Sequence, residues 1–228
     1  MDVGRPPPIR VLLVDDHRLL TDALSGLLSR EPDIEVSGVA ATVAGARDAA
    51  REPMDVVLMD YTLPDGTGAQ ATREIKRRWP SAKVVFLTGL SDDETMLDAV
   101  AAGADGYLTK DRAGTDVVLA VRAAHAGEIL LPRAVAYELA ERVAAARKRS
   151  DAYIDVPDLT PRELEVLRAL VGGRSSREIC AELYISPNTL RTHVQNLLNK
   201  LRVHSKLEAV AVALRQQLVE MPPREIYS

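Results

Sequence analysis

Side chains that could perform chemistry follow several apolar runs of the chain, each at the point where the run ends. Asp15 and Asp16 follow VLLV, Asp60 follows DVVLM, Thr88 follows VVFL and Lys110 follows GYLT. Two adjacent carboxylates repel each other, so a helix terminus, a cation or a function must justify the pair Asp15 and Asp16. The rest of the sequence decides among these three explanations.

Brought together, these groups would suit metal-assisted phosphoryl chemistry. Close carboxylates repel one another in a low-dielectric crevice, and a hard divalent cation such as Mg²⁺ relieves that repulsion through oxygen ligands. Asp60 would be free to attack phosphorus, while Lys110 pairs with the transferred group and the Thr88 hydroxyl hydrogen-bonds it. Taken singly, each residue has a plainer explanation: an aspartate that caps a helix, a solvated lysine or a hydroxyl at a strand end.

The segments between these residues predict a doubly wound α/β domain. Short aliphatic runs alternate five times with stretches whose apolar residues recur at helical spacing. Nearly continuous apolar strands indicate a parallel sheet covered by helices on both faces. The predicted strands are 9–14, 34–40, 55–60, 83–88 and 106–110, and the predicted helices are 18–29, 43–51, 69–78, 94–102 and 116–126. The carboxyl ends of such strands share one crevice, where the polar residues should meet.

Residues 9 to about 128 resemble the receiver domain of two-component response regulators, which has the CheY-like fold. The resemblance rests on the acidic pair, on Asp60 with Pro64 after it, on Thr88, and on GYLTKD, which contains Tyr107 and Lys110. It implies that Asp60 accepts a phosphoryl group from a sensor histidine kinase or a small phosphodonor. It also implies that Thr88 and Tyr107 relay the switch and that Lys110 contacts the phosphoryl group.

The same resemblance implies a magnesium site. Asp15 and Asp16 would hold Mg²⁺ together with Asp60 and the backbone carbonyl of Thr62. A phosphatase that forms an aspartyl phosphate is the rival interpretation of such a site. Phosphatases of that type usually carry a second aspartate two residues after the nucleophile, where this chain has Thr62. We therefore expect a regulator and not an enzyme.

The back half of the chain predicts a small all-α domain. TPRE places Thr160 at an N-cap with Glu163 completing a capping box, SSRE repeats this spacing from Ser175, and SPNT opens a third helix at Ser186. A last apolar segment, 206–218, predicts a fourth helix. The helix in SSREICAEL and the one after SPNT, joined by a short turn, have the form of a helix-turn-helix.

The helix that begins after Ser186 carries one apolar face and one polar face. Leu190, Val194, Leu197, Leu198 and Leu201 lie on the apolar face. The opposite side has residue types that suit base edges and phosphates in a major groove. Six Lys or Arg residues against two Glu between positions 174 and 206 give this segment a positive field for phosphate contacts. On polarity alone, a solvated helix of an ordinary bundle explains the pattern about as well.

Residues 158 to 217 resemble the LuxR-type helix-turn-helix of the NarL/FixJ response regulators, on the run LTPRELEVLRALVGGRSSREICAELYISPNTLRTHVQNLLNKLRVHS. By position, Arg191, Thr192 and Gln195 fall where that family reads bases. The resemblance also implies that the last helix dimerises the domain. Promoter DNA, a second copy of the chain and RNA polymerase are then the expected partners. The predicted DNA-binding residues are Asn188, Thr189, Arg191, Thr192, Gln195, Asn199, Lys200 and Arg202.

Charge and composition support two domains with different partners. Residues 1–130 hold 14 Lys and Arg against 21 Asp and Glu, whereas residues 131–228 hold 15 against 12. We therefore predict a receiver at 1–131, a linker helix and linker at 132–157, and a DNA-binding domain at 158–228. The sequence has no apolar run long enough to span a bilayer and no secretory signal, which predicts a cytoplasmic protein without a membrane partner. A DNA-binding module controlled by a ligand or partner protein, independent of phosphorylation, is the alternative function.

Overall fold

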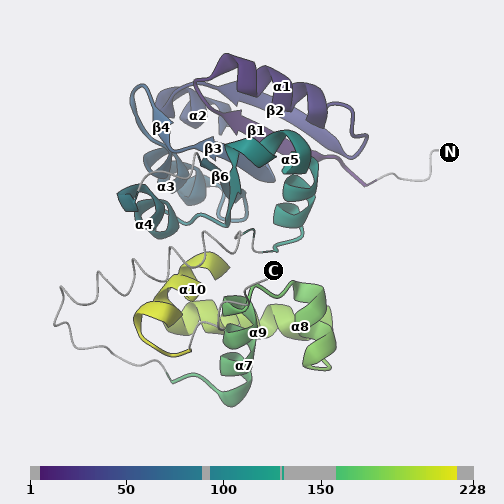
Figure 1. The fold of residues 1–228 in the computed structure, drawn as a ribbon, viewed down its shortest axis with the longest axis vertical. Helices are drawn as coiled ribbons and strands as arrows, with labels where there is room; N and C mark the ends of the chain where they lie inside the picture. The colour runs from purple at the N-terminus through teal and green to yellow at the C-terminus, as the bar shows by residue number, and fades with distance from the viewer. Residues whose placement is uncertain (1–5, 89–92, 129, 131–157, 220–228) are drawn as a thin grey trace, which may run out of the picture. The chain divides into compact units, whose positions relative to one another are not determined.

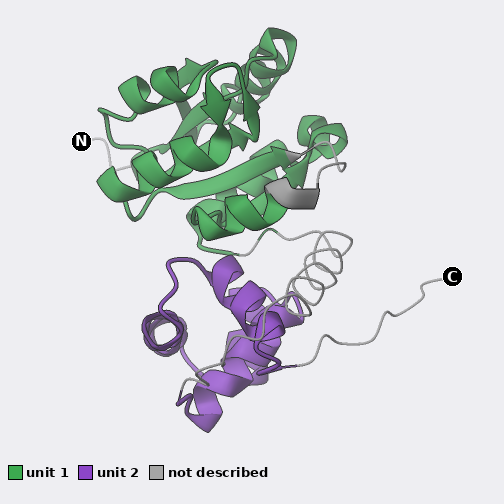
Figure 2. Cartoon of the chain, turned by 90° about the vertical axis from the view of Figure 1, so that its left-hand side faces the viewer, with its two compact units in different colours: residues 1–130 green, residues 131–228 purple. Residues whose placement is uncertain are grey.

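The computed structural model describes residues 6–88, 93–128, 130 and 158–219. The chain divides into two compact units, residues 1–130 and residues 131–228 (Figure 2). The predicted linker helix and linker, 132–157, lie outside the described residues. The predicted domain boundaries therefore stay predictions.

Unit 1 is built on a five-stranded parallel sheet, as predicted. Its strand order is β2-β1-β3-β6-β7, so the winding of the chain reverses between β1 and β3 (Figure 1). All five residues of β3 are buried, which explains its continuous apolar run. The strands of the sheet are β1 (Ile9–Val14), β2 (Ile34–Ala40), β3 (Val56–Asp60), β6 (Lys83–Thr88) and β7 (Gly106–Thr109).

Helices cover both faces of this sheet (Figure 1). On one face, Leu24 of α1 and Val121 of α5 share a core cluster with Val11 and Leu58 of the strands. Helices α2, α3 and α4 lie on the other side. The helices of unit 1 are α1 (Arg18–Leu28), α2 (Val43–Ala49), α3 (Gly68–Arg78), α4 (Asp93–Ala101) and α5 (Lys110–His125).

Two features of unit 1 differ from the prediction. Helix α5 begins at Lys110, six residues before the predicted start at position 116, because Thr109 takes the N-cap position and Ala113 is fully buried against the sheet. The polar stretch KDRAGT shows little periodicity, so its packing could not be anticipated. The segment after Asp60 forms a short antiparallel hairpin of β4 (Thr62–Leu63) and β5 (Gly66–Thr67). It was not predicted, because the segment contains no run of apolar residues.

Unit 2 contains four described helices: α7 (Pro161–Val171), α8 (Ser176–Glu182), α9 (Pro187–Leu201) and α10 (Lys206–Arg215). The capping boxes at Thr160 and Ser175 and the N-cap at Ser186 are confirmed. Helix α10 ends three residues before the predicted position 218, because Gln217 adopts a left-handed conformation with φ 54°. None of the described helices is long and apolar enough to cross a lipid bilayer.

Candidate acidic crevice and helix-turn-helix surface

The carboxylates converge at the carboxyl edge of the sheet, as the strand directions predicted. Asp60 ends β3 and Asp15 follows β1, and they are 6% and 3% exposed. Oxygen atoms of Asp15, Asp16 and Asp60 and the Nδ1 atom of His17 lie within 4.8 Å of one another. This acidic crevice sits at the point where the winding of the sheet reverses, which is where ligands bind in folds of this kind.

Lys110 joins the two buried carboxylates. As the first residue of α5, it places Nζ 2.9 Å from Asp60 Oδ2 and 2.9 Å from Asp15 Oδ2. Burial alone would lower the pKa of Lys110, but the contacts with both carboxylates outweigh burial and raise it. Burial raises the pKa of Asp60, and the charge of Asp15 adds to this, although the bond from Lys110 opposes both. The lysine therefore favours the ionised form of Asp60.

The donors of the acidic crevice fit a hard divalent cation. Asp15 Oδ2 is buried and accepts no hydrogen bond from the described residues, since its contact with Lys110 is an ion pair without hydrogen-bond geometry. A buried carboxylate oxygen is stabilised by a cation, which Lys110 supplies here and which a metal ion could also supply. Three carboxylates supply oxygen ligands of the type Mg²⁺ takes. Thr62 begins β4, two residues after Asp60, and the role of its carbonyl stays a prediction.

Tyr107 and Thr88 sit on the neighbouring strands. Tyr107 is 4% exposed, and its hydroxyl donates a 2.8 Å hydrogen bond to the carbonyl of Met96 in α4. Thr88 ends β6 and pairs in register with Thr109 of β7. The side chain of Thr88 lies outside what the structure describes, so the relay between these two residues stays a prediction.

Two residues that contact the aspartates of the crevice were not predicted as site residues. The backbone N–H of His17 and its ring Nδ1 both contact Asp15 Oδ1, at 2.8 and 2.9 Å, and the same ring atom lies 2.9 Å from Asp16. The adjacency of His17 to the acidic pair was the available signal. Gly68 begins α3 where a Cβ atom would lie 2.1 Å from the carbonyl oxygen of Asp60, so only glycine lets the helix start so close to β3.

Tyr61, next to Asp60 in the chain, links the crevice to α4. Its backbone N–H donates to Asp60 Oδ1 at 2.8 Å, and its hydroxyl donates to Asp98 Oδ2 at 3.1 Å. Its ring lies 6.2 Å from that of Phe86 on β6, between centroids. The sequence placed Tyr61 beside the site, but it gave no signal of the partner 37 residues away.

In unit 2, helix α9 presents the predicted polar face to solvent. Leu190, Val194, Leu197 and Leu201 are buried, whereas all eight predicted DNA-binding residues are exposed. Helix α8 precedes α9 across a turn in which Tyr184 has φ 53° and is 95% exposed. The pair has the arrangement of a helix-turn-helix (Figure 1).

The predicted DNA-binding residues differ in how free their side chains are. Arg191 makes no ion pair or hydrogen bond through its side chain with any residue that the structure describes. Gln195 Nε2 donates to Asn199 Oδ1 at 3.2 Å. Lys200 Nζ donates to Glu163 Oε2 at 2.8 Å and to the carbonyl of Asp158 at 2.9 Å, so hydrogen bonds within unit 2 already occupy its ammonium group. Contact of these residues with DNA stays a prediction.

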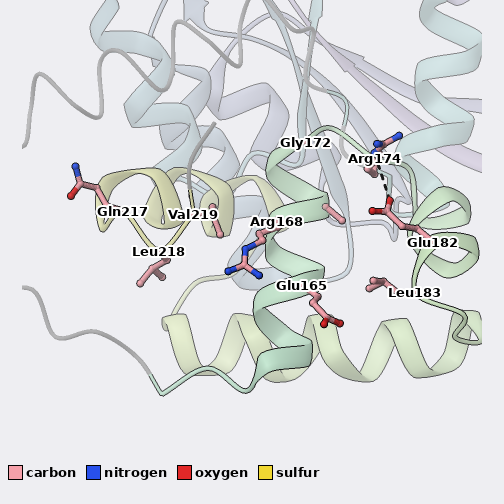
Figure 3. A pocket seen from close by; sticks show the side chains of 10 residues that line it. Glu165, Arg168, Gly172, Arg174, Glu182, Leu183, Gln217, Leu218 and Val219 are labelled. Carbon is pink, nitrogen blue, oxygen red and sulfur yellow. Dashed lines mark ion pairs between the residues drawn. The ribbon is translucent and has the colours of Figure 1, made fainter. Parts of the chain in front are cut away.

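A hollow of about 710 Å³ lies on another part of unit 2 (Figure 3). Residues of α7 and α8 and the segment after α10 line it, and no residue of α9 does. Arg174 Nε and Glu182 Oε2 form an ion pair of 3.7 Å across its rim. The hollow is therefore separate from the predicted DNA-binding face.

Known proteins resemble this chain over both units. Residues 11–122 match the response regulator receiver domain, and residues 157–213 match the luxR family of bacterial regulatory proteins. The response regulator protein VraR of Staphylococcus epidermidis is 36% identical over 213 residues, which cover 93% of this chain and 99% of that protein. The transcriptional regulatory protein LiaR of Bacillus subtilis is 37% identical over 212 residues, which cover 92% and 99%. A crystal structure of a LuxR-family two-component response regulator from Aurantimonas sp. SI85-9A1 shares 34% identity and a TM-score of 0.54, covering 60% of this chain and 99% of that chain.

A receiver fold with an acidic crevice, followed by an all-α helix-turn-helix domain, defines a response regulator with a DNA-binding output domain. This chain belongs to the two-component response regulators of the LuxR type. Proteins of this class regulate transcription and are not enzymes.

Proposed function

We propose that this response regulator accepts a phosphoryl group on Asp60 in the presence of Mg²⁺, and that phosphorylation controls promoter binding through α9. The observation that carries the proposal is the position of Lys110, which contacts the buried carboxylates of Asp15 and Asp60 at 2.9 Å each. A sensor histidine kinase or a small phosphodonor would supply the phosphoryl group.

In the proposed reaction, a carboxylate oxygen of Asp60 forms a bond to phosphorus. The bond from phosphorus to the donor breaks, and its electron pair leaves with the donor. Asp15, Asp16 and Asp60 would hold Mg²⁺, which neutralises charge on the transferred group. Lys110 favours the ionised form of Asp60, and it is placed to contact the phosphoryl oxygens once the carboxylate is esterified.

Intact-mass spectrometry after incubation with acetyl phosphate and Mg²⁺ tests this proposal. The wild type should gain one phosphoryl group, whereas Asp60→Asn should gain none and chelation of Mg²⁺ should abolish the gain. Asp48→Asn is the matched control, because Asp48 is an exposed carboxylate of α2 paired with Arg51, and it should be modified like the wild type. Phosphorylation of Asp60→Asn at the wild-type level would refute the assignment.

For the output domain, we propose that the exposed face of α9 binds the major groove. Arg191 and Thr192 are exposed in the first half of the helix, which is the part that reaches base edges in helix-turn-helix proteins. Because Lys200 is held by Glu163, we expect its main contribution to be to the stability of unit 2. Arg202, exposed at the end of α9, is the freer candidate for a phosphate contact.

DNA affinity measured at several salt concentrations tests this surface. Arg191→Ala should cost about 1 to 3 kcal/mol of specific binding if it reads a base, and Arg202→Ala should reduce the salt slope by about 0.9 if it contacts a phosphate. Arg168→Ala is the control, since Arg168 is an exposed arginine of α7 in the hollow of Figure 3. Equal losses for the control and Arg191→Ala would refute the assignment to α9.

We further propose that the protein acts as a homodimer through α10. Leu207 and Val210 of this helix pack inside unit 2, while Arg215 is exposed near its end. Sedimentation velocity with and without acetyl phosphate tests dimerisation, and Arg215→Glu should weaken a dimer formed at this helix. A dimer insensitive to this change would place the interface elsewhere.

A further inference from the structure

The segment that follows Asp60 reaches α4 by a direct chain of contacts. At its near end, the Tyr61 N–H donates to Asp60 Oδ1 at 2.8 Å. At its far end, the Tyr61 hydroxyl donates to Asp98 Oδ2 at 3.1 Å. One residue thus contacts both the carboxylate proposed to be phosphorylated and a helix on the outer layer of the fold.

Three aromatic rings form a row beside this link. The ring of Phe86 lies 6.2 Å from that of Tyr61 and 5.9 Å from that of Tyr107, with tilted ring planes. Both ends of the row carry a hydroxyl that donates to α4: Tyr61 to Asp98 and Tyr107 to the Met96 carbonyl. Since Phe86 is only 1% exposed, the row cannot shift at one end without displacing a packed ring.

The Asp98 carboxylate that receives Tyr61 is also held by α3. Arg73 of α3 donates to Asp98 Oδ1, while Tyr61 occupies Oδ2. The Asp98 side chain is 37% exposed and that of Arg73 is 47% exposed, so solvent screens the ion pair. The hydrogen bond from the Tyr61 hydroxyl to Asp98 is part-buried, and Tyr61 directly follows Asp60 in the chain. Of the two contacts of Asp98, this bond is therefore the one that can respond to a change at Asp60.

We propose that Tyr61 is a positioning residue that couples the chemical state of Asp60 to the placement of α4. The inference rests on the proposed phosphorylation of Asp60. An ionised carboxylate accepts the Tyr61 N–H through a charge-assisted hydrogen bond, and conversion to an acyl phosphate removes that charge from the carboxyl group. The hydrogen bond from the Tyr61 N–H to Asp60 is then weakened, so Tyr61 can shift and the bond from its hydroxyl to Asp98 is released. The hydrogen bonds of this route are separate from the predicted relay of Thr88 and Tyr107, although the Tyr107 ring ends the same aromatic row.

Hydrogen exchange of the α4 amides at residues 96–101 in the full chain tests the coupling. Tyr61→Phe deletes the hydroxyl and keeps the ring that packs on Phe86. In the unphosphorylated protein, the variant should exchange about fivefold faster at these amides, as expected for the loss of one hydrogen bond to a charged group that is partly solvated. After phosphorylation with acetyl phosphate and Mg²⁺, wild type and variant should exchange at the same rate.

A second variant and a double mutant guard against a purely structural effect. Asp98→Ala removes both the acceptor of the Tyr61 hydroxyl and the contact with Arg73, so it should also accelerate exchange. Adding Tyr61→Phe to Asp98→Ala should cause no further acceleration, because the bond is already absent. Tyr184→Phe removes a hydroxyl from an exposed tyrosine of unit 2 and should leave α4 unchanged. Thermal unfolding of each variant verifies that it folds.

Three results would overturn the inference. Tyr61→Phe could accelerate exchange equally with and without phosphorylation, it could have no effect in either state, or the effects of the two single changes could add. Intact mass of the same samples separates these outcomes from failure of the proposed function. If the wild type gains no phosphoryl group, phosphorylation and the coupling are both rejected; if it does, the exchange data judge the coupling alone.

Discussion

Replacing Asp60 by asparagine should stabilise the receiver unit in the absence of Mg²⁺. Asp60 lies within 4.8 Å of the Asp15 and Asp16 carboxylates, and at an effective dielectric constant of about 20 each such contact costs about 3.5 kcal/mol before solvent screening. Asp16 is 38% exposed at its side chain, so its contribution is reduced. By the same formula, the attraction between Lys110 and Asp60 at 2.9 Å stabilises the ionised carboxylate by about 5.7 kcal/mol, which nearly cancels the repulsion from Asp15 and Asp16.

Burial then decides the sign. Asp60 is 6% exposed, and burial raises its pKa, so ionising this carboxyl group costs free energy in the folded protein. The asparagine side chain of the variant would carry no charge, and Lys110 would keep its contact with Asp15. We expect Asp60→Asn to gain about 1 to 2 kcal/mol at neutral pH, which corresponds to a rise of roughly 4 to 8 °C in the unfolding temperature of a domain of this size.

The pH dependence gives the sign an independent check. The pKa of Asp60 in the folded protein lies above its unfolded value of about 3.9, so protonation of Asp60 stabilises the folded state. This stabilisation is complete below that pH and is lost as pH rises through the folded pKa. The advantage of Asp60→Asn should therefore shrink as pH falls toward about 4. Mg²⁺ should raise the unfolding temperature of the wild type and have less effect on the variant.

Differential scanning calorimetry of the full chain measures these shifts, and the transition that Mg²⁺ moves identifies the receiver. Asp48→Asn, which alters an exposed ion pair, should change the unfolding temperature little. The reasoning fails if Asp60→Asn unfolds at a lower temperature than the wild type without Mg²⁺ at neutral pH.

Two further predictions concern single contacts. Lys200→Met should destabilise unit 2 by about 2 kcal/mol, because it removes the cationic partner of the buried Glu163 carboxylate. The loss should be smaller than for a fully buried ion pair, since the Lys200 side chain is 37% exposed. Burial would raise the pKa of Glu163, but Lys200 and the Thr160 cap outweigh burial and lower it. The difference in the free energy of unfolding between wild type and Lys200→Met, measured by urea denaturation, should therefore shrink as pH falls below about 4.5. A difference that does not change with pH would contradict this. Gly68→Ala should destabilise unit 1 by about 1 to 3 kcal/mol, because the new Cβ atom would clash with the Asp60 carbonyl. Gly114→Ala has open space around the new Cβ atom and should stabilise α5 by up to about 1 kcal/mol. Equal effects of the two glycine changes in the same denaturation assay would count against the steric argument.

The sequence by itself determined the features that depend on local pattern. The apolar runs and their polar ends predicted the parallel sheet and the meeting of Asp15, Asp60 and Lys110, because parallel strands end at a common edge. The helix starts at Thr160 and Ser186 followed from capping residues, which act within three positions of the chain.

Tertiary structure decided the contacts between distant segments. Lys200 was predicted to be a DNA-binding residue, yet its ammonium group lies against Glu163, 37 residues away. Tyr61 stood beside the predicted nucleophile, yet its link to Asp98 depends on how α4 packs beside α3. Local sequence fixes a residue's type and its place on an element, whereas partners far along the chain are set by the packing of whole elements, which no short pattern encodes.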